Sequence, residues 1–278
     1  MIVTVTHFTD PACPWDFAAE PIRLRLETTF GNALRWRRRL IVLAEDPSQA
    51  PDPRDLVDPH AMIRARFGQP ASLVVKPRPS ATRPACLAVV AARRQGLGDR
   101  LLRELRLLVV GEGRLIDLPE TLAEAVRRAG ADRARLEADM GDPAVDEALT
   151  ADMEAARTTS AAARAIPGAT RTWHDGRARY TAPSYVYRRG DVEFVLPGMR
   201  TWDAHQAVVA NLAPEAPRAP APSVAAVLRP ESLTTAEIAM VCDLSIDEAR
   251  GRLVALAEAG RAVRTPLAQD ATWRLRAD

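Results

Sequence analysis

Apolar and polar positions at the start of the chain predict a strand, a helix and a second strand. Residues Ile2 to His7 alternate with the two-residue period of a short strand. From Asp16 the apolar residues recur at helical spacing until Gly31, although the run contains Pro21. A second strand is expected over Leu34 to Leu43. The first 45 residues therefore predict a β-α-β unit.

A long Ala- and Leu-rich stretch then predicts a helical insertion at about residues 52–165. The Pro- and Asp-rich segment 45–59 is expected to be irregular. Between about residues 83 and 163 the apolar residues recur at the spacing of packed core helices. Turns break this stretch at Gly96, at residues 111–113, at Gly130 and at residues 141–143.

Strand signals return after the helical stretch. Residues 184–187 and 192–196 flank a Gly-containing turn and predict a β-hairpin, and Thr201 then opens a helix. Four prolines in the thirteen residues from Asn211 to Ser223 predict a semi-rigid linker. The pattern therefore predicts an α/β domain over residues 1–212 and a linker over 213–223.

The C-terminal segment, residues 224–278, predicts a small α+β domain. Thr234 caps a helix, residues 243–245 make a turn, and a longer helix from Ile246 ends at Gly260. Two short strands around a loop suit the remaining residues. This order is typical of a winged helix.

Composition excludes several classes of protein. The 278 residues are 47% hydrophobic and 27% charged, which excludes a disordered or fibrous chain, and the net charge of +2 gives no general attraction for nucleic acid. No apolar run approaches the roughly 20 residues of a membrane span, and no secretory signal is visible. Three cysteines far apart predict a reducing cytoplasm without a disulfide framework. Lys76 is the only lysine among 38 basic residues.

Winged helices often read DNA with their longer helix, but this segment lacks the charge for it. Residues 223–278 hold seven arginines against eight acidic residues, and Asp247 and Glu248 occupy the first turn of the longer helix. Because phosphate attraction supplies most non-specific affinity, we expect a contact with protein, or a homodimer, rather than with DNA.

The sharpest chemical signal is Cys13-Pro-Trp-Asp16, between the first strand and the first helix. Unpaired amides and the helix dipole at that position favour a thiolate, which is the nucleophilic form of cysteine. Pro14 suits the first helical turn. A lone cysteine is also often a small buried apolar residue, so the motif alone leaves both interpretations open.

Three segments carry a resemblance to a known family. They are Asp10-Pro-Ala-Cys-Pro-Trp-Asp16, Thr82-Arg-Pro-Ala-Cys-Leu-Ala-Val-Val90 and Thr181-Ala-Pro-Ser-Tyr185. Over roughly residues 1–212 the chain resembles the DsbA-like branch of the thioredoxin superfamily, especially its FrnE-type and 2-hydroxychromene-2-carboxylate isomerase-like members. The resemblance implies a thioredoxin-like α/β fold with an inserted helical domain, followed here by the winged-helix-like domain.

The resemblance also implies an active site. Cys13 matches the family's nucleophilic cysteine, and Pro183 matches the cis-proline that faces it. Ala182 matches the residue whose backbone pairs with extended substrate, and Pro14, Trp15 and Asp16 complete the substrate-binding set.

Asp16 departs from the family pattern, because it replaces the second cysteine of the motif. A resolving thiol normally releases the mixed disulfide, and a carboxylate cannot do so. The charge of Asp16 also opposes thiolate formation, unless the side chain mainly caps the helix. A dithiol oxidase is therefore not expected, which leaves monothiol exchange, conjugation of a thiol cofactor, or no catalysis.

The remaining candidates are less specific. Cys86 is either a resolving thiol or a buried structural cysteine, and the latter also suits Cys242. His7 could line the site or be a strand residue with satisfied hydrogen bonds. No spacing of histidines, cysteines or carboxylates predicts a metal site. The arginines at positions 35 and 37–39 predict a solvated strand face, with binding of a phosphate or carboxylate of a thiol cofactor as the alternative.

Two hypotheses follow. The first is a cytoplasmic, thiol-dependent oxidoreductase or isomerase that acts through Cys13, holds no bound cofactor and uses a low-molecular-weight thiol as co-substrate. The second is a non-catalytic interaction or redox-sensing protein. A Cys13 sealed from solvent, or a trans bond between Ala182 and Pro183 far from it, would contradict the first.

Overall fold

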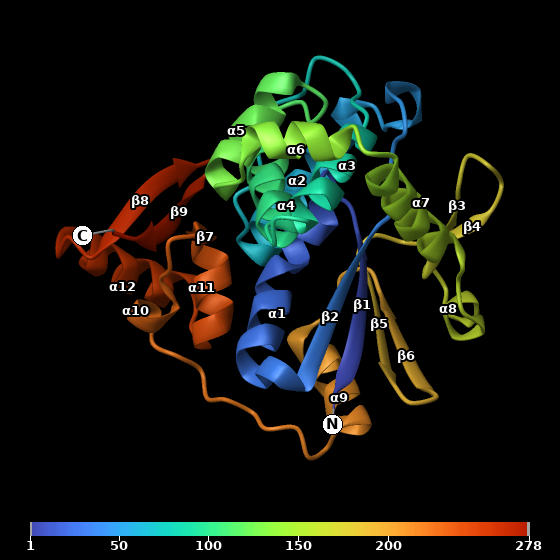
Figure 1. Ribbon diagram of the computed structural model, residues 1–278. Coiled ribbons are helices and arrows are strands. Elements are labelled where there is room, and N and C mark those ends of the chain that lie inside the picture. Colours follow the sequence, from blue (N-terminus) through green and yellow to red (C-terminus); the bar gives the residue numbers. More distant parts are fainter. Residues whose placement is uncertain (1, 277–278) are drawn as a thin grey trace.

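The computed structural model describes residues 2–276, which contain a four-stranded sheet with helices on both faces (Figure 1). The strand order is β2-β1-β5-β6. β1 and β2 run parallel, whereas β5 is antiparallel to β1 and to β6. The bounds are β1 (Val3–Thr9), β2 (Leu34–Leu40), β5 (Ser184–Arg189) and β6 (Val192–Pro197).

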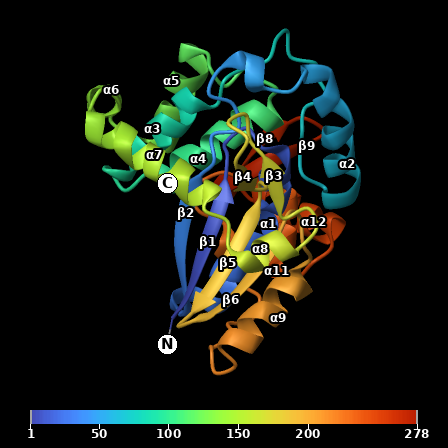
Figure 2. The same cartoon turned by 90° about the vertical axis from the view of Figure 1, so that its right-hand side faces the viewer.

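Two layers cover this sheet. On one face α1 (Pro14–Phe30) and α9 (Trp202–Leu212) share an apolar cluster with β1 and β5. The other face packs against α7 (Pro143–Arg157) and α8 (Ala161–Ala165), and Figure 2 views the molecule from that side. The predicted α/β architecture is therefore confirmed, with the helix of the β-α-β unit packed on the sheet.

The insertion between β2 and β5 is helical, as predicted. A second apolar core joins four of its helices to α7, and Ile63 of its first helix packs instead with Phe17 and Ala18 of α1. Its main helices are α2 (Val57–Phe67), α3 (Arg83–Arg93), α4 (Gly98–Arg106), α5 (Pro119–Ala129) and α6 (Arg133–Met140). Shorter turns are the 3-10 helices Gly31–Ala33, Pro47–Gln49 and Pro53–Leu56 and the π-helical turn Leu107–Gly111.

Two sequence predictions need correction, and one pair of strands was not predicted. The segment 45–59 is not wholly irregular, because 3-10 turns begin at Pro47 and α2 begins at Val57. The second strand ends at Leu40, three residues early, because Val42 adopts a positive φ of 58° that is incompatible with a strand. The hairpin of β3 (Thr170–Thr172) and β4 (Ala178–Tyr180) was not predicted.

The C-terminal elements follow the predicted order of helices and strands. A three-stranded sheet of order β7-β9-β8 packs with three helices around Trp273. Capping boxes begin both longer helices, with Thr234 and Glu237 at one and Ser245 and Glu248 at the other. The elements are α10 (Val224–Val227), β7 (Leu233–Thr234), α11 (Thr235–Cys242), α12 (Ile246–Glu258), β8 (Ala262–Leu267) and β9 (Asp270–Leu275). The assignment to winged helices and the domain limits stay predictions.

These C-terminal elements pack on the rest of the chain, with α11 beside α1 (Figure 1). Arg103 of α4 forms a buried ion pair with Glu237 of α11, at 2.6 Å. At the tip of the β8–β9 hairpin, Leu267 lies against Gly111, where an added methyl group would come within 3.0 Å of the leucine side chain. The hairpin tip is therefore a close internal contact.

His205 of α9 gives a test of how the helix packs on the sheet. Burial lowers the pKa of His205 to about 3, from an ordinary 6.5, and its Nδ1 lies 2.6 Å from the Tyr187 hydroxyl. Below pH 6.5 the unfolded chain binds a proton at this histidine and the folded chain does not, so stability falls with pH until about pH 3. We expect His205→Gln to flatten the profile of unfolding free energy between pH 6 and 4.5 by about 1.4 kcal/mol per pH unit, measured by urea titration. If the slope of unfolding free energy against pH is the same in both proteins, His205 is not the group responsible. Buried His7 is present in both proteins, so its contribution cancels in the comparison.

Candidate functional site

Cys13 lies at the end of the loop that joins β1 to α1, and it faces the loop that precedes β5. It is the N-cap residue of α1, with Pro14 at the first helical position. Its Sγ lies 3.5 Å from the carbonyl oxygen of Ala182, and the peptide bond between Ala182 and Pro183 is cis. Two segments far apart in sequence therefore meet at the thiol, as the resemblance implies.

The thiol is not poised as an anion. Cys13 is 3% exposed, and burial, followed by the charge of Asp16, raises the pKa of its thiol well above the ordinary value. The helix N-terminus does act in the predicted direction, since a hydrogen bond from the Asp16 amide lowers the pKa of Cys13, but the net shift is upward. The cause is that desolvation and a neighbouring carboxylate outweigh the helix amides.

Asp16 does not cap the helix, contrary to one interpretation of the sequence. No side chain caps α1, and the Asp16 carboxylate turns inward, with no exposed surface. Its Oδ1 accepts a hydrogen bond from Thr9 Oγ1 at 2.7 Å and lies 2.8 Å from His7 Nε2. His7 and Thr9 are two positions apart on β1, so their side chains lie on the same face of the strand. On that face both reach Asp16 of α1.

A buried arginine completes this cluster. Arg106, from the last turn of α4, is 2% exposed; it donates to Thr9 Oγ1, and its guanidinium lies 3.5 Å from Asp16 Oδ1. It also pairs with Glu20 of α1 at 2.9 Å. Asp16 is thus part of a network of charged side chains in the protein interior, which the sequence did not reveal.

Asp10 holds the other side of the loop that carries Cys13. It is fully buried, and its carboxylate accepts hydrogen bonds from the amides of Ala12 and Leu43, each at 2.8 Å, and from Thr82 at 2.9 Å. Burial raises the pKa of Asp10. The Asp10 carboxylate therefore holds together the loop that carries Cys13, the segment after β2 and the start of α3.

Cys86 also contacts Asp10, with its Sγ 3.7 Å from Oδ2. It has no exposed surface, and burial, followed by the charge of Asp10, raises the pKa of its thiol well above the ordinary value. The interpretation as a buried cysteine is confirmed, whereas a resolving role stays a prediction. Cys13, Cys86 and Cys242 are all free thiols.

A small cavity of about 90 Å³ lies beside the thiol loop. Lys76 lines it, together with Ala12 and Pro14 on either side of Cys13. Burial lowers the pKa of the Lys76 ammonium to about 8, and within residues 2–276 it makes no hydrogen bond or ion pair. The rest of the lining is Leu43, Ala44, Ala50, Pro51, Pro53, Leu56, Arg78, Pro79, Ser80 and Thr82.

The predicted substrate-binding residues differ in exposure. Trp15 and Ala182 are half-buried and reach the surface, whereas Pro14, Asp16 and Pro183 are buried. The amide of Ala182 donates to no acceptor within residues 2–276. Ala182 and Trp15 are therefore the members of the set that can touch a ligand from solvent.

Two arginines of β2 are exposed and two are paired within the chain, whereas a contact with a thiol cofactor stays a prediction. Arg35 and Arg37 are exposed, as a solvated face requires. Arg38 pairs with Glu27 and Asp99, and Arg39 pairs with Asp152. Internal pairing thus occupies half of the group.

Within residues 2–276 no cluster of three or more histidines, cysteines and carboxylates could hold a metal ion. None of the helices described there has the length and apolar character needed to cross a bilayer.

The family of the chain follows from the comparison with family models. Residues 4–162, more than half of the chain, match the DSBA-like thioredoxin domain. The chain belongs to the DSBA-like thioredoxin family. No curated protein matches this sequence.

Solved structures of other proteins have a fold similar to that of this chain. A Nitrosomonas europaea protein, described as a candidate protein disulfide isomerase, is 13% identical with a TM-score of 0.60, covering 76% of this chain and 97% of its own. The cytosolic disulfide reductase DsbM from Pseudomonas aeruginosa is 21% identical with a TM-score of 0.55, covering 76% and 100%. The same reductase with GSH is 20% identical, covering 75% and 100%, with a TM-score of 0.54. At these identities the likeness concerns the fold alone.

Proposed function

We propose that this member of the DSBA-like family binds an extended segment of a polypeptide partner beside Cys13 and does not exchange disulfides. The observation that carries the proposal is the replacement at Asp16. Where the family motif has a second thiol, this chain has a carboxylate that is held in a buried network and opposes ionisation of Cys13. In this proposal the chain has lost the sulfur chemistry and keeps the contact of Cys13 with Ala182 beside the cis bond.

The binding element is the backbone before Pro183. The Ala182 amide has no acceptor within residues 2–276, and its residue is half-exposed. An extended peptide satisfies such an amide by strand-like pairing, which gives affinity without chemistry. Trp15, half-exposed in the first turn of α1, supplies an apolar contact of the kind that dominates interfaces.

The reactivity of Cys13 tests the absence of exchange. We expect iodoacetamide at pH 7.5 to alkylate Cys13 in the folded chain at least about 10-fold more slowly than in the urea-unfolded chain, because each unit of raised pKa removes tenfold of the thiolate. Peptide mapping by mass spectrometry assigns the rate to Cys13, with Cys242, a second buried thiol, as an internal comparison. Alkylation faster than in the unfolded chain would refute the proposal.

Binding is tested with reduced, carboxymethylated α-lactalbumin as an unfolded probe, followed by fluorescence anisotropy. Ala182→Pro removes one hydrogen-bond donor and should weaken binding about 2- to 10-fold, whereas Phe194→Ala on exposed β6 should not change it. Cys13→Ser should keep binding within about 2-fold. Lack of binding by the unaltered chain, or its loss in Cys13→Ser, would contradict the proposal.

A second candidate is slow exchange with a small thiol, and the cavity with Lys76 favours it. A thiolate at Cys13 would attack one sulfur of a small disulfide, form a mixed disulfide and release the other half as a thiolate. A second small thiolate would then free Cys13 and leave as the small disulfide. The unpaired Lys76 ammonium would hold a carboxylate of that co-substrate. Incubation with glutathione disulfide, followed by mass spectrometry of Cys13, distinguishes this candidate from simple binding.

We propose that the C-terminal elements brace α1, which packs beside α11, and the helical insertion, rather than bind DNA. The buried pair of Arg103 and Glu237 and the packing of Leu267 on Gly111 support this role. A reducing cytoplasm, suggested by three free thiols, and a homodimer stay predictions.

A further inference from the structure

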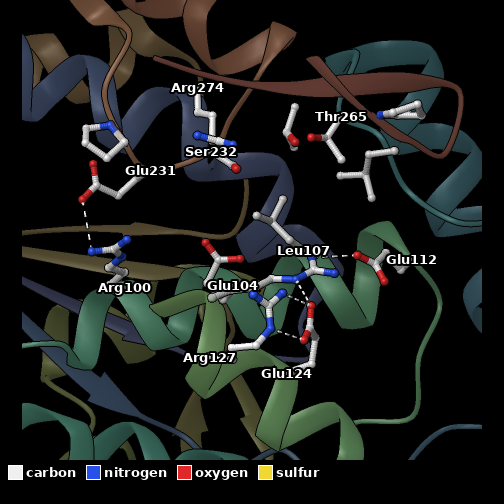
Figure 3. A pocket seen from close by; sticks show the side chains of 15 residues that line it. Arg100, Glu104, Leu107, Glu112, Glu124, Arg127, Glu231, Ser232, Thr265 and Arg274 are labelled. Atoms are coloured by element: carbon white, nitrogen blue, oxygen red, sulfur yellow. Dashed lines mark hydrogen bonds and ion pairs between the residues drawn. The ribbon is translucent and has the colours of Figure 1, made fainter. Parts of the chain in front are cut away.

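One unassigned feature is a cavity of about 470 Å³ between the helical insertion and the C-terminal elements (Figure 3). Its walls come from α4, α5, the loop before β7 and the β8–β9 hairpin. The volume lies in the range of small-molecule sites. Its lining is Arg100, Glu104, Leu107, Glu112, Glu124, Arg127, Arg128, Pro230, Glu231, Ser232, Thr265, Pro266, Leu267, Thr272 and Arg274.

Four arginines and four glutamates line this cavity, and most of them neutralise one another. The internal ion pairs are Arg100 with Glu231 at 3.6 Å, Arg127 with Glu124 at 2.7 Å, and Arg128 with Glu112 at 2.7 Å. One residue of each sign, Glu104 and Arg274, has no opposite charge within 4.0 Å in residues 2–276.

Glu104 is unusual because it is buried and unpaired. The residue is 5% exposed, and its carboxylate makes no hydrogen bond or ion pair within the described part of the chain. Burial raises its pKa, although Arg103, Arg128 and Arg100 act in the opposite direction. The Glu104 oxygens are not sealed off, because they are absent from the buried atoms that lack a partner, so a cationic group that entered the cavity could reach them.

Arg274 supplies the complementary charge from the other wall. It comes from β9, is half-buried, and its guanidinium contacts only the Leu275 carbonyl, at 3.5 Å, among the described residues. Figure 3 shows Glu104 and Arg274 entering from opposite sides, with Ser232 between the ribbon elements that carry them. An arginine whose guanidinium N–H groups are largely unused is well suited to bind a carboxylate through two parallel hydrogen bonds.

We propose that this cavity binds a small zwitterion of the α-amino acid type, with the ligand ammonium on Glu104 and the ligand carboxylate on Arg274. The hydroxyl groups of Ser232, Thr265 and Thr272 are available for the ligand's remaining polar atoms. Because the two charged contacts come from α4 and β9, an occupant would tie the C-terminal elements to the insertion. This site shares no residue with the Cys13 site and does not depend on the function proposed for it.

The test is isothermal titration calorimetry of the full chain with each of the twenty free amino acids and with diglycine, up to 10 mM. We expect at least one of these probes to bind, and Glu104→Gln and Arg274→Gln to weaken its binding at least about 10-fold each. Glu120→Gln and Arg276→Gln, which change exposed charges beside the cavity, should alter the affinity less than about 2-fold. Because Arg274 is half-buried, its variant should fold even if the Glu104 variant does not.

Modified probes then assign each contact. N-acetylation of the bound amino acid should weaken binding to the unaltered chain and have little further effect on Glu104→Gln. Conversion of the ligand carboxylate to an amide should behave in the same way with Arg274→Gln. If none of the probes binds by 10 mM, or if both variants bind as the unaltered chain does, the cavity is not a zwitterion site.

Discussion

Replacing Arg106 with methionine is expected to lower the free energy of unfolding by about 3–5 kcal/mol. The guanidinium is 2% exposed and lies between two carboxylates of α1, at 2.9 Å from Glu20 and 3.5 Å from Asp16. Methionine keeps most of the apolar volume but leaves the two buried charges with fewer cationic contacts. Urea denaturation followed by circular dichroism measures the change.

A surface pair provides the matched control for this prediction. Arg133 pairs with Glu137 along α6 at 2.7 Å, and both side chains are more than half exposed. Arg133→Met should therefore lower the unfolding free energy by no more than about 1 kcal/mol. In the double variant with Asp16→Asn, part of the Arg106→Met loss should return, because one uncompensated charge is removed. A loss below about 1 kcal/mol for Arg106→Met would show that the network contributes little to stability.

The sequence predicted the meeting of Cys13 with Ala182, because the motif and the proline segment both had family counterparts. It could not predict the arginine beside Asp16. Arg106 is about a hundred positions from the thiol loop, and its pattern is that of one charged residue among many on an Ala- and Leu-rich stretch. Only the packing of α4 against α1 brings it to Asp16.

The ionisation of Cys13 shows a second limit. The position at a helix N-terminus favours a thiolate, and that local argument is correct in isolation. Burial and the orientation of Asp16 decide the outcome instead, and both depend on how α1 sits on β1. The short hairpin of β3 and β4 was missed for a related reason, since strands of three residues carry too little periodicity to detect.

Removing the charge of Asp16 is expected to activate the thiol. Asp16→Asn keeps the shape of the side chain but removes the carboxylate that, after burial, contributes most to the raised pKa of Cys13. A nearby charge shifts a pKa by about 1–3 units, so its removal should raise the thiolate fraction of Cys13 by the corresponding power of ten. A thiolate of lower pKa is also a weaker nucleophile, which cancels a little under half of this gain on a logarithmic scale. The alkylation rate of Cys13 at pH 7.5 should therefore rise about 3- to 30-fold. Asp203→Asn, in the exposed first turn of α9, should leave it unchanged.

Asp16→Cys extends the same argument from ionisation to turnover. It restores a second thiol three residues after Cys13, so oxidation should join the two sulfurs with loss of two hydrogens, which mass spectrometry detects. With dithiothreitol as reductant, this variant should reduce insulin measurably faster than the unaltered chain, whereas Asp16→Asn should not. If Asp16→Cys forms no disulfide, the barrier to redox chemistry lies in the burial of the Cys13 site rather than in the single replaced residue. If Asp16→Cys does reduce insulin faster, the lack of disulfide exchange in the unaltered chain is explained by the Asp16 carboxylate. Thr9, His7 and Arg106 hold that carboxylate in place.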